Sequence, residues 1–588
     1  MGMGCTRVLD RVAAALGELE EAPVEFAAVQ DVPCGGVLWA LPALEANGLL
    51  RHTRKYFQLP KGFYSVVNIF LLLACMALAR IKSAEGLRYC PPGEWGKLLG
   101  LDRIPEVRTL REKLGHLSKD EPVRAWSAQL SQEWMESDPE LAGLLYVDGH
   151  VRVYHGRQTP LPKRYVARQR LCLRGTTDYW VNDREGRPFF VVPAPVNPGI
   201  IEMMRTEIVP RLLEEVPHQP SAQELEADRD RHRLVVIFDR EGYSPAWMKE
   251  LREQRIACHT YRKYPGEDWA ESEFSQQTVR GPRGEEWQMK LAERGSWLGG
   301  KLWVREIRKL TDTGHQTAVI STDFQSATPQ IAVQMFSRWS QENYFKYMIE
   351  HYNLDRLVEY QTEPLAETTR VVNPAHRKLE GQIKSQAAKL SRKRAQFGAL
   401  MLEGELEVSP VEDYQKRQAD LQETIELLEK DLDTLKQQRR GVARHITLAE
   451  LPEKERFAQL AGGRKHLLDT IKMIACRAET AMAALLRPSM SRTEEARSLL
   501  REIFTTEADL LPDEKEGTLT VSLHHLANAS SDHLVHELSH HLNASNTVFP
   551  GTNLRLIYKL LLLKSGRSGV LKFVTKRPDF LLSGLEPI

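Results

Sequence analysis

Apolar positions change their spacing several times along the chain, and each change predicts a different kind of structure. Residues 1–135 carry apolar side chains mostly at helical spacing, whereas residues 140–365 carry short apolar runs separated by helical segments. Residues 374–443 and 444–588 return to helical spacing. We therefore predict an α/β domain between a helical N-terminal region and two helical C-terminal parts, the first of them a hairpin.

The α/β domain begins with strand-like segments and continues with strands that alternate with helices. The expected order is strand Leu141–Asp148, its hairpin partner Val151–Tyr154, strands Gln169–Trp180 and Phe189–Val192, helix Gly199–Val216, strand Leu234–Asp239, helix Pro245–Arg255 and strand Ile256–Tyr261. This order predicts a mixed sheet with helices on its faces.

Two further segments predict additional strands and a pair of long helices. Lys301–Leu310 and Gln316–Thr322 alternate around a turn at Thr311–His315, which predicts an inserted β subdomain at residues 265–322. Within 374–443, apolar residues follow heptad spacing, most clearly Leu421, Ile425, Leu428, Leu432 and Leu435. A coiled-coil hairpin is expected there, with packing, dimerisation and DNA clamping as open roles.

The most apolar run of the chain is Phe63–Ala79. It is short for a membrane span and contains Ser65 and Asn68, so a buried core helix is expected, with no membrane partner. The seven cysteines are widely scattered and form no CxxC pair, which indicates a reduced, cytoplasmic compartment.

Charge is balanced over the whole chain but not along it. Lys and Arg total 80 against 79 Asp and Glu, so the total predicts no particular partner. The stretch 149–175 has no acid and predicts a local positive surface that binds phosphate; its cations include Arg152, Arg157, Lys163 and Arg164. The acids that follow it, Asp178 and Asp183, are expected on solvent-facing loops.

A pair of short helices in the N-terminal region also carries positive charge. One is expected around Glu94–Leu99, and the next carries Arg108, Arg111 and Lys113. This spacing fits a helix-turn-helix DNA reader, but the favoured interpretation is an ordinary helical hairpin with a solvated basic face.

Three carboxylates are the strongest candidates for chemistry. Asp148 and Asp239 end the apolar runs LLYVD and VVIFD, which predict buried strands, and Glu342 lies on a strongly helical segment. Carboxylate oxygens select Mg²⁺ or Mn²⁺ over zinc. Two such ions activate the attacking oxygen and stabilise the leaving oxygen of a phosphodiester. We therefore expect these acids to be catalytic ligands of two metal ions.

The third acid has both supporting neighbours and competitors. Arg338 and Lys346 stand four residues before and after Glu342, so the three positions share one helix stripe. These cations would favour the ionised carboxylate and bind phosphate oxygens. A surface ladder of ion pairs would give the same pattern, and Glu350 and Asp323 are the other candidates for the third acid.

The segments around the acids resemble those of a known enzyme family. VDGHVRVYHG, IFDREGYSP and RWSQENYFKYM are similar to the motifs of bacterial insertion-sequence transposases of the DDE class, and RKHLLDTIKMIACRAETAMAALL extends the likeness. The resemblance implies an RNase H-like catalytic domain with Asp148, Asp239 and Glu342 on two Mg²⁺ or Mn²⁺ ions. It implies cleavage and strand transfer of double-stranded DNA by a nucleoid-associated homodimer.

One signature of some of these transposases is incomplete here. On the helix of the third acid they carry Tyr-x2-Arg-x3-Glu-x6-Lys, and Arg338 and Glu342 match its spacing. Met335 and Ile349 replace the Tyr and the Lys, which puts the subgroup in doubt. Lys346 is the candidate substitute for the missing cation.

Two other functions are weighed against catalysis on DNA by the three acids. A DNA-binding derivative without activity would not need all three carboxylates. The sequence His536-Glu537-Leu538-Ser539-His540 is a literal HExxH that could bind zinc in a metallopeptidase. After it, no acid or histidine beyond His541 occurs until Asp579, so an ordinary polar helix face is expected.

Overall fold

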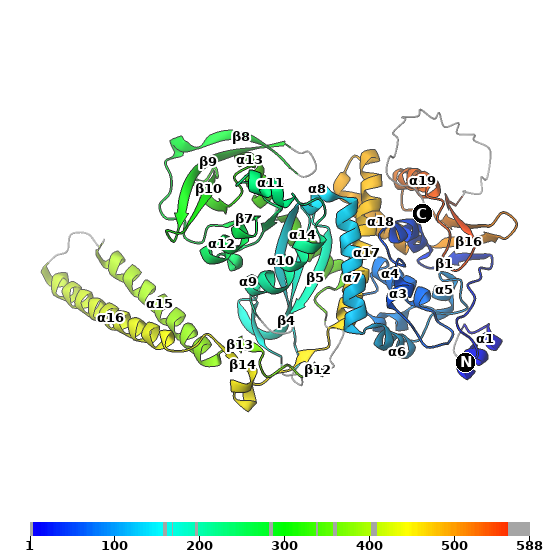
Figure 1. Ribbon diagram of the computed structural model, residues 1–588, viewed down its shortest axis with the longest axis horizontal. Helices are drawn as coiled ribbons and strands as arrows, with labels where there is room; N and C mark the ends of the chain where they lie inside the picture. The colour runs from blue at the N-terminus through cyan, green and yellow to red at the C-terminus, as the bar shows by residue number, and fades with distance from the viewer. Residues whose placement is uncertain are drawn as a thin grey trace.

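The computed structural model describes residues 4–156, 161–166, 169–194, 198–281, 286–336, 339–356, 362–401 and 408–561. For residues 165, 339–342 and 408–410 it describes the backbone without the side chain. The molecule is elongated: a two-helix arm extends from one side of a body that contains a large sheet and a helical region (Figure 1).

A ten-stranded mixed sheet forms the centre of the body. Its order is β3-β4-β2-β6-β7-β11-β10-β9-β8, and β5 also pairs with β4. The strands are β2 Leu144–Val153, β3 Lys163–Val166, β4 Leu171–Asn182, β5 Pro188–Ala194, β6 Leu234–Ile237, β7 Ile256–Tyr261, β8 Ser275–Arg280, β9 Glu286–Leu298, β10 Leu302–Leu310 and β11 Gln316–Ser321. β2 pairs antiparallel with β4 and parallel with β6, and β6 pairs parallel with β7.

The first strand differs from its prediction at both ends. Residues Pro139–Ala142 form the short helix α8, and β2 continues without a turn through Val151 to Val153. The expected hairpin partner Val151–Tyr154 was therefore wrong. The partner of this part of β2 is instead β4, which is twelve residues long. It pairs with β2 as far as Val153, opposite Gly175, so the chain makes no turn after Asp148.

The strands of the expected insertion continue the main sheet. β11 pairs antiparallel with β7 through Val319 opposite Tyr261, and β10, β9 and β8 follow it outward. This pairing satisfies the backbone groups that β7 would otherwise expose at an edge. The segment is therefore an extension of the sheet and not a separate β sheet.

Helices cover the sheet and link it to the rest of the body. They are α9 Ile200–Met203 and α10 Val209–Glu215, α11 Ala222–Ala227, α12 Pro245–Glu253, α13 Thr328–Phe336 and α14 Trp339–Tyr352. The predicted helix 199–216 is interrupted by a π-helical turn at Met204–Ile208. Pro210 follows that turn, and because proline lacks a backbone N–H it cannot complete regular α-helical hydrogen bonding.

The N-terminal region is helical and packs around α4 Val66–Leu78. Asn68, which interrupts the apolar run in the sequence, completes a capping box with Ser65 at the start of this buried helix. The neighbouring helices are α1 Val8–Leu16, α2 Leu41–Ala46, α3 Thr53–Tyr56, α5 Pro92–Lys97, α6 Val107–Leu117 and α7 Asp120–Ser137. Within the described ranges, no helix combines the length and apolar character needed to cross a membrane.

The C-terminal region shares its core with the N-terminal region. Helix α17, Gly463–Leu486, packs against α4, α7, α2, α18 and β5. A four-stranded sheet combines β1 Val29–Val32 with β16 Ala508–Asp513, β17 Thr518–Leu523 and β18 Arg555–Leu560. Helices α18 Ala496–Thr505 and α19 Ala529–Ala544 complete this part.

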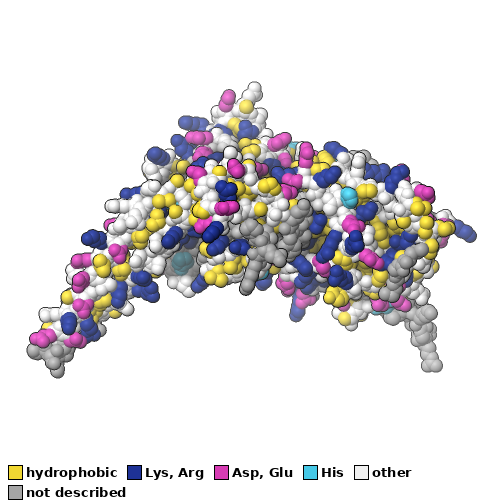
Figure 2. Space-filling view, turned by 90° about the horizontal axis from the view of Figure 1, so that it is seen from below, with side chains coloured by type: hydrophobic (Ala, Val, Ile, Leu, Met, Phe, Trp, Pro, Cys, Tyr) yellow, Lys and Arg dark blue, Asp and Glu magenta, His cyan; other side chains and the backbone are white. Residues whose placement is uncertain are grey.

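The arm consists of α15 Pro374–Met401 and α16 Val408–Arg440. Ile383 and Leu390 pack against Leu432, with Ile425, Leu428 and Leu435 beside them. The strand pairs β13 Arg370–Val372 with β14 His445–Thr447, and β12 Thr362–Glu363 with β15 Gln459–Leu460, lie at its base. On the face that Figure 2 shows, side chains of both charge signs are interspersed along the arm.

Candidate active site

Asp148, in the middle of β2, and Asp239, just after the end of β6, lie beside each other on two adjacent strands. The last paired residues of β2 and β6 are Tyr146 and Ile237. Asp148 and Asp239 each follow two residues later, and Asp239 is still extended at φ −82° and ψ −174°. Since adjacent strands are about 4.8 Å apart, the two acids lie on the same face of the sheet as close neighbours. Both are half-buried.

Local hydrogen bonds orient both carboxylates. Asp148 Oδ1 accepts from the backbone N–H of Gly149 at 2.8 Å, and Asp239 Oδ1 accepts from the backbone N–H of Glu241 at 2.7 Å. The hydroxyl of Thr260 on β7 donates to the Asp239 carbonyl at 3.1 Å. The bond from the Glu241 N–H to Asp239 caps the short 3₁₀ turn Arg240–Gly242. This turn follows β6 directly after the acid.

Helix α14 packs on the same sheet face as Asp148. Trp180 lies directly opposite Asp148 on β4, and its ring lies 5.7 Å from that of Tyr344 and 6.3 Å from that of Phe345. His150, two residues after Asp148, stacks on Phe345 with 5.1 Å between ring centroids. Residues opposite each other in an antiparallel pair, or two apart on one strand, share a face. α14 therefore covers the face that carries the two aspartates.

Glu342 belongs to α14, and the structure describes its backbone without its side chain. It precedes Phe345 by three residues, which places the two positions on one side of the helix. Lys346 is exposed on the same helix. Arg338 lies outside the described residues, so its predicted place on the stripe stays a prediction.

Glu241 is a further acid at this site that the sequence interpretation did not single out. Desolvation by the surrounding protein, followed by the negative charges of Asp239 and Asp148, raises the pKa of Glu241. Glu241 is nonetheless exposed to solvent. The signal in the sequence was the second acid of DREG, two residues after Asp239. Three carboxylates thus concentrate negative charge at this end of the sheet.

Arg164 lies inside the protein next to this acidic group. It is 2% exposed, and burial lowers its pKa to about 10 despite the opposing charges of Tyr179, Glu241 and Asp178. Its charge in turn lowers the pKa of Glu241. The expectation that Arg164 belongs to a phosphate-binding surface is therefore wrong. Arg164 is buried, and its positive charge instead offsets part of the negative charge of the neighbouring acids.

Arg152 is also turned inward. Its Nε lies 2.5 Å from Asp178 Oδ2, and both side chains are buried. Arg152 was predicted to be a surface phosphate ligand, and Asp178 was predicted to lie on a solvent-facing loop. Both predictions were wrong, because Asp178 lies on the buried strand β4 and pairs there with Arg152. Lys163 on β3 is exposed as expected, and Arg157 lies outside the described residues.

The competing candidates occupy other environments. Glu350 is exposed and lies 3.7 Å from His351. Asp323 is fully buried after β11, where its Oδ1 accepts from the backbone N–H groups of Gln325 at 2.8 Å and Ser326 at 3.0 Å. Asp183, also expected at the surface, is fully buried and accepts from Arg187. These acids stabilise turns or ion pairs, and none of them lies beside Asp148 and Asp239.

The HExxH residues lie on α19 and pair locally. His536 and His540 are exposed, with 3.2 Å between their Nε2 atoms, and Glu537 lies 3.4 Å from His533. Among the described His, Cys, Asp and Glu side chains, one trio has ligand atoms within 4.8 Å of one another, Asp31, Asp509 and His524. Neither the HExxH residues nor Asp148, Asp239 and Glu241 form such a trio.

Fold and site together define an α/β protein with carboxylates side by side on two adjacent parallel strands, one within β2 and one just after β6. A family model described as "Transposase protein" matches residues 2–562. The chain therefore belongs to this transposase family and is a DNA transposase, an enzyme that cleaves and transfers DNA strands.

Comparisons with solved structures and with curated protein sequences add no further assignment. A solved structure, a cryo-EM structure of a piggyBac transposase synaptic complex with hairpin DNA, is 11% identical with a TM-score of 0.29. The match covers 54% of this chain and 68% of that chain. No curated protein sequence matches significantly.

Proposed function

We propose that this transposase is of the DDE class and that its catalytic domain is RNase H-like. The order β5-β4-β2-β6-β7 supports this, with antiparallel pairing on one side of β2 and parallel pairing on the other. One observation carries the proposal. β2 and β6 pair as far as Tyr146 and Ile237, and each strand places an aspartate, Asp148 or Asp239, two residues after this last pair. The proposed substrate is the double-stranded DNA of a bacterial insertion sequence.

Glu342 is the proposed third acid. Its helix packs across the sheet face of Asp148, and it precedes by three residues the ring of Phe345 that stacks on His150. Glu350 is exposed and Asp323 is enclosed by its own turn, so neither has comparable support. The motif resemblance around position 342 gives a second, independent argument.

The donor set fits hard divalent cations. Asp148, Asp239 and Glu342 would hold Mg²⁺ or Mn²⁺, since carboxylate oxygens are the ligands these ions prefer. Glu241 interacts electrostatically with Asp239 and Asp148 and adds to the negative charge that a cation would neutralise. When bound, two such ions would activate the attacking oxygen and stabilise the leaving oxygen.

The residues of the chain have separate parts in this proposal. The backbone N–H groups of Gly149 and Glu241 hold the two aspartates in place. Buried Arg164 limits the repulsion that Glu241 adds. Exposed Lys346 and Lys163 are candidates to bind DNA phosphates. Because two element ends must be joined, we propose that a homodimer assembles on DNA.

The test is metal-dependent nicking of DNA that carries the element's ends. We expect Asp148→Asn, Asp239→Asn and Glu342→Gln each to lower the Mn²⁺-dependent nicking rate by more than about 100-fold, equivalent to about 2.7 kcal/mol of transition-state stabilisation. Mn²⁺ affinity, measured by calorimetry on the same proteins, should fall as well.

Asp312→Asn, in the exposed turn after β10, is the matched control and should nick like the parent protein. Glu350→Gln and Asp323→Asn decide between the candidates for the third acid. Normal nicking by Asp239→Asn would refute the proposal, and normal nicking by Glu342→Gln would remove only the third acid.

A further inference from the structure

Side chains from both ends of the chain meet at one end of the four-stranded sheet. Asp31 lies on β1, Asp509 lies on β16, and His524 directly follows β17. Each offers one oxygen or nitrogen atom, and these three atoms all lie within 4.8 Å of one another. Figure 1 shows β1 beside β16, although 478 positions separate the two aspartates in the sequence.

The pairing of the strands brings these side chains together. The N–H of His524 donates to the carbonyl of Glu507 at 3.0 Å, so these two residues lie opposite each other just beyond β16 and β17. Residues opposite each other in an antiparallel pair, or two apart on one strand, share a face of the sheet, so Asp509 lies on the face of Glu507 and His524. Asp31 joins them from an irregular part of β1, where its φ is 56° and its N–H donates to Asp509 Oδ1 at 3.0 Å.

Both aspartates approach the same nitrogen of the imidazole. Asp509 Oδ1 lies 3.0 Å and Asp31 Oδ1 lies 3.6 Å from Nε2 of His524. Ligands that bind zinc at about 2.0 to 2.1 Å with tetrahedral angles lie about 3.3 Å apart. An imidazole has at most one proton on Nε2 to share between the two carboxylates, whereas a divalent cation would bind both oxygens and the nitrogen. The spacing therefore suits a metal ion.

Glu507 lies on the other side of the imidazole. Its Oε2 is 3.8 Å from Nδ1 of His524, which is near enough for an electrostatic interaction with an N–H at that nitrogen. Histidines that bind metals usually direct their second N–H at a carboxylate or carbonyl, which fixes the ring and leaves the other nitrogen free for the ion. Glu507 thus supports the orientation in which Nε2 is the ligand atom.

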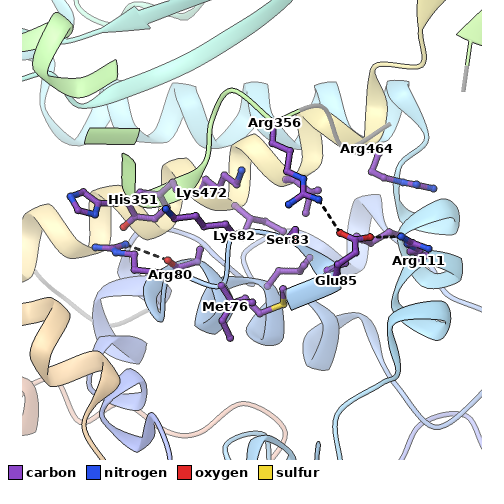
Figure 3. Close-up of a pocket in the computed structure, with 18 residues that line it drawn as sticks. Met76, Arg80, Lys82, Ser83, Glu85, Arg111, His351, Arg356, Arg464 and Lys472 are labelled. Carbon is purple, nitrogen blue, oxygen red and sulfur yellow. Dashed lines mark hydrogen bonds and ion pairs between the residues drawn. The ribbon is translucent and has the colours of Figure 1, made fainter. Parts of the chain in front are cut away.

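The three acids around His524 lack the basic partners that other acids of the body have. Glu85, for example, lies between Arg111 and Arg356 (Figure 3). Among the described residues, no lysine or arginine forms an ion pair with any of the three acids. Asp509 is only 6% exposed, and a buried carboxylate needs opposite charge to compensate its lost hydration. His524 supplies at most one positive charge against three negative ones, so a divalent cation would improve the balance.

We propose that Asp31, Asp509 and His524 bind one Zn²⁺ ion, which fastens β1 to β16 and β17. Carboxylates accept zinc and magnesium alike, but an imidazole ligand favours zinc. Three protein ligands leave one position of a tetrahedral ion to water. Because β1 comes from the N-terminal region and the other two strands come from the C-terminal region, the bound ion stabilises the folded body. The inference does not depend on the metal ions of the proposed active site.

The experiment is calorimetry with zinc chloride on the full chain, after a chelator has removed any bound metal. We expect Asp31→Asn and His524→Asn each to weaken zinc binding by about tenfold or more, because each variant loses one ligand. Asp31→Asn is the decisive variant, because its side chain is 72% exposed and asparagine tolerates a positive φ as aspartate does. Circular dichroism should show an unchanged fold for this variant.

Zinc should also raise the melting temperature of the parent protein and leave that of Asp31→Asn nearly unchanged. Magnesium chloride at the same concentration should give no such shift in either protein. The proposal fails if Asp31→Asn and His524→Asn bind zinc as the parent does, or if magnesium binds as tightly as zinc.

Two control variants address the other places where zinc could bind. His540→Asn removes a histidine of the HExxH helix, and Asp148→Asn removes a carboxylate of the proposed active site. Both should keep the tightest zinc binding and the shift in melting temperature. Loss of that binding in His540→Asn would place the ion on α19, and loss in Asp148→Asn would place it at the main sheet; either result overturns the proposal.

Discussion

Individual buried charges on α17 show how strongly single residues depend on their surroundings. Lys465 pairs with Asp469 one turn along the helix, and both are buried. His466 between them is 3% exposed, and neither ring nitrogen bonds to a described residue. Burial is the main cause that lowers its pKa to about 4, with Arg211, Arg124 and Lys465 adding to it and Asp469 opposing. His466 is therefore neutral at pH 7 in the folded protein.

This pKa predicts an acid-sensitive contribution to stability. The unfolded histidine, with its ordinary pKa near 6.5, takes up a proton before the folded one does, so stability is lost as pH falls from about 6.5 to 4. The contribution of His466 should be about 3 kcal/mol over that range. His466→Leu should remove it, measured as the free energy of unfolding in urea at several pH values.

His259 has the same lowered pKa of about 4 and remains in both proteins, so only the difference between parent and variant reports on His466. Parallel stability curves for the two proteins would show that His466 is already protonated or accessible in the folded state.

At the scale of elements, one buried carboxylate of α17 joins the C-terminal end of α14 to the helical part of the body. Glu479 of α17 accepts from the hydroxyls of Tyr347 and Tyr352, each at 2.7 Å, and pairs with Arg80 at 2.5 Å. The Glu479 side chain is fully buried. α14 carries Glu342 near its start and these tyrosines near its end, so this network fixes the helix that the proposed site needs.

Removal of this carboxylate should be costly. Glu479→Ala leaves Arg80 without its ion-pair partner and two tyrosine hydroxyls without their acceptor. We expect a loss of about 3 to 5 kcal/mol in unfolding free energy, as for other broken buried pairs. Denaturant titration followed by circular dichroism measures it.

Glu350→Ala, which removes an exposed carboxylate from the same helix, should change stability by less than about 0.5 kcal/mol. A similar small effect for Glu479→Ala would mean that the network does not hold α14.

For the whole molecule, one core joins segments from both ends of the chain. The main apolar core runs from Ala22 to Tyr558, and β1 from the N-terminal region pairs with β16. The arm has an apolar cluster of its own, formed by Ile383, Leu390 and Leu432. The body is thus expected to unfold as one unit, whereas the arm depends on its own packing.

Deletion of the arm tests this division. Residues 376–440 can be replaced by a short Gly-Ser linker, because Val372 and His445 at the base pair with each other. We expect the melting temperature of the body to change by less than about 3 °C, since a loss well below 1 kcal/mol shifts a large domain little.

Truncation of residues 4–33, which removes β1, is the contrasting variant and should lower the melting temperature or prevent folding. A large shift on arm deletion would show that α15 and α16 stabilise the body.

Local spacing in the sequence was enough to predict much of the fold and the place of Asp239 after a buried strand. Strand β7 matches its predicted range, and Asp239 follows the end of β6 as expected, whereas Asp148 lies within β2 because that strand continues to Val153. Such predictions succeed because side-chain periodicity and a terminal acid depend on neighbours a few residues away.

Burial of charge and the meeting of distant segments were decided only in three dimensions. Arg152 and Arg164 look like surface cations in the sequence, and Glu241 looks like an ordinary loop acid. Their roles depend on Asp178, Asp148 and other partners that the sheet brings from distant parts of the chain. A charged group is stable inside a protein only when such partners compensate its lost hydration, and no local pattern contains that information.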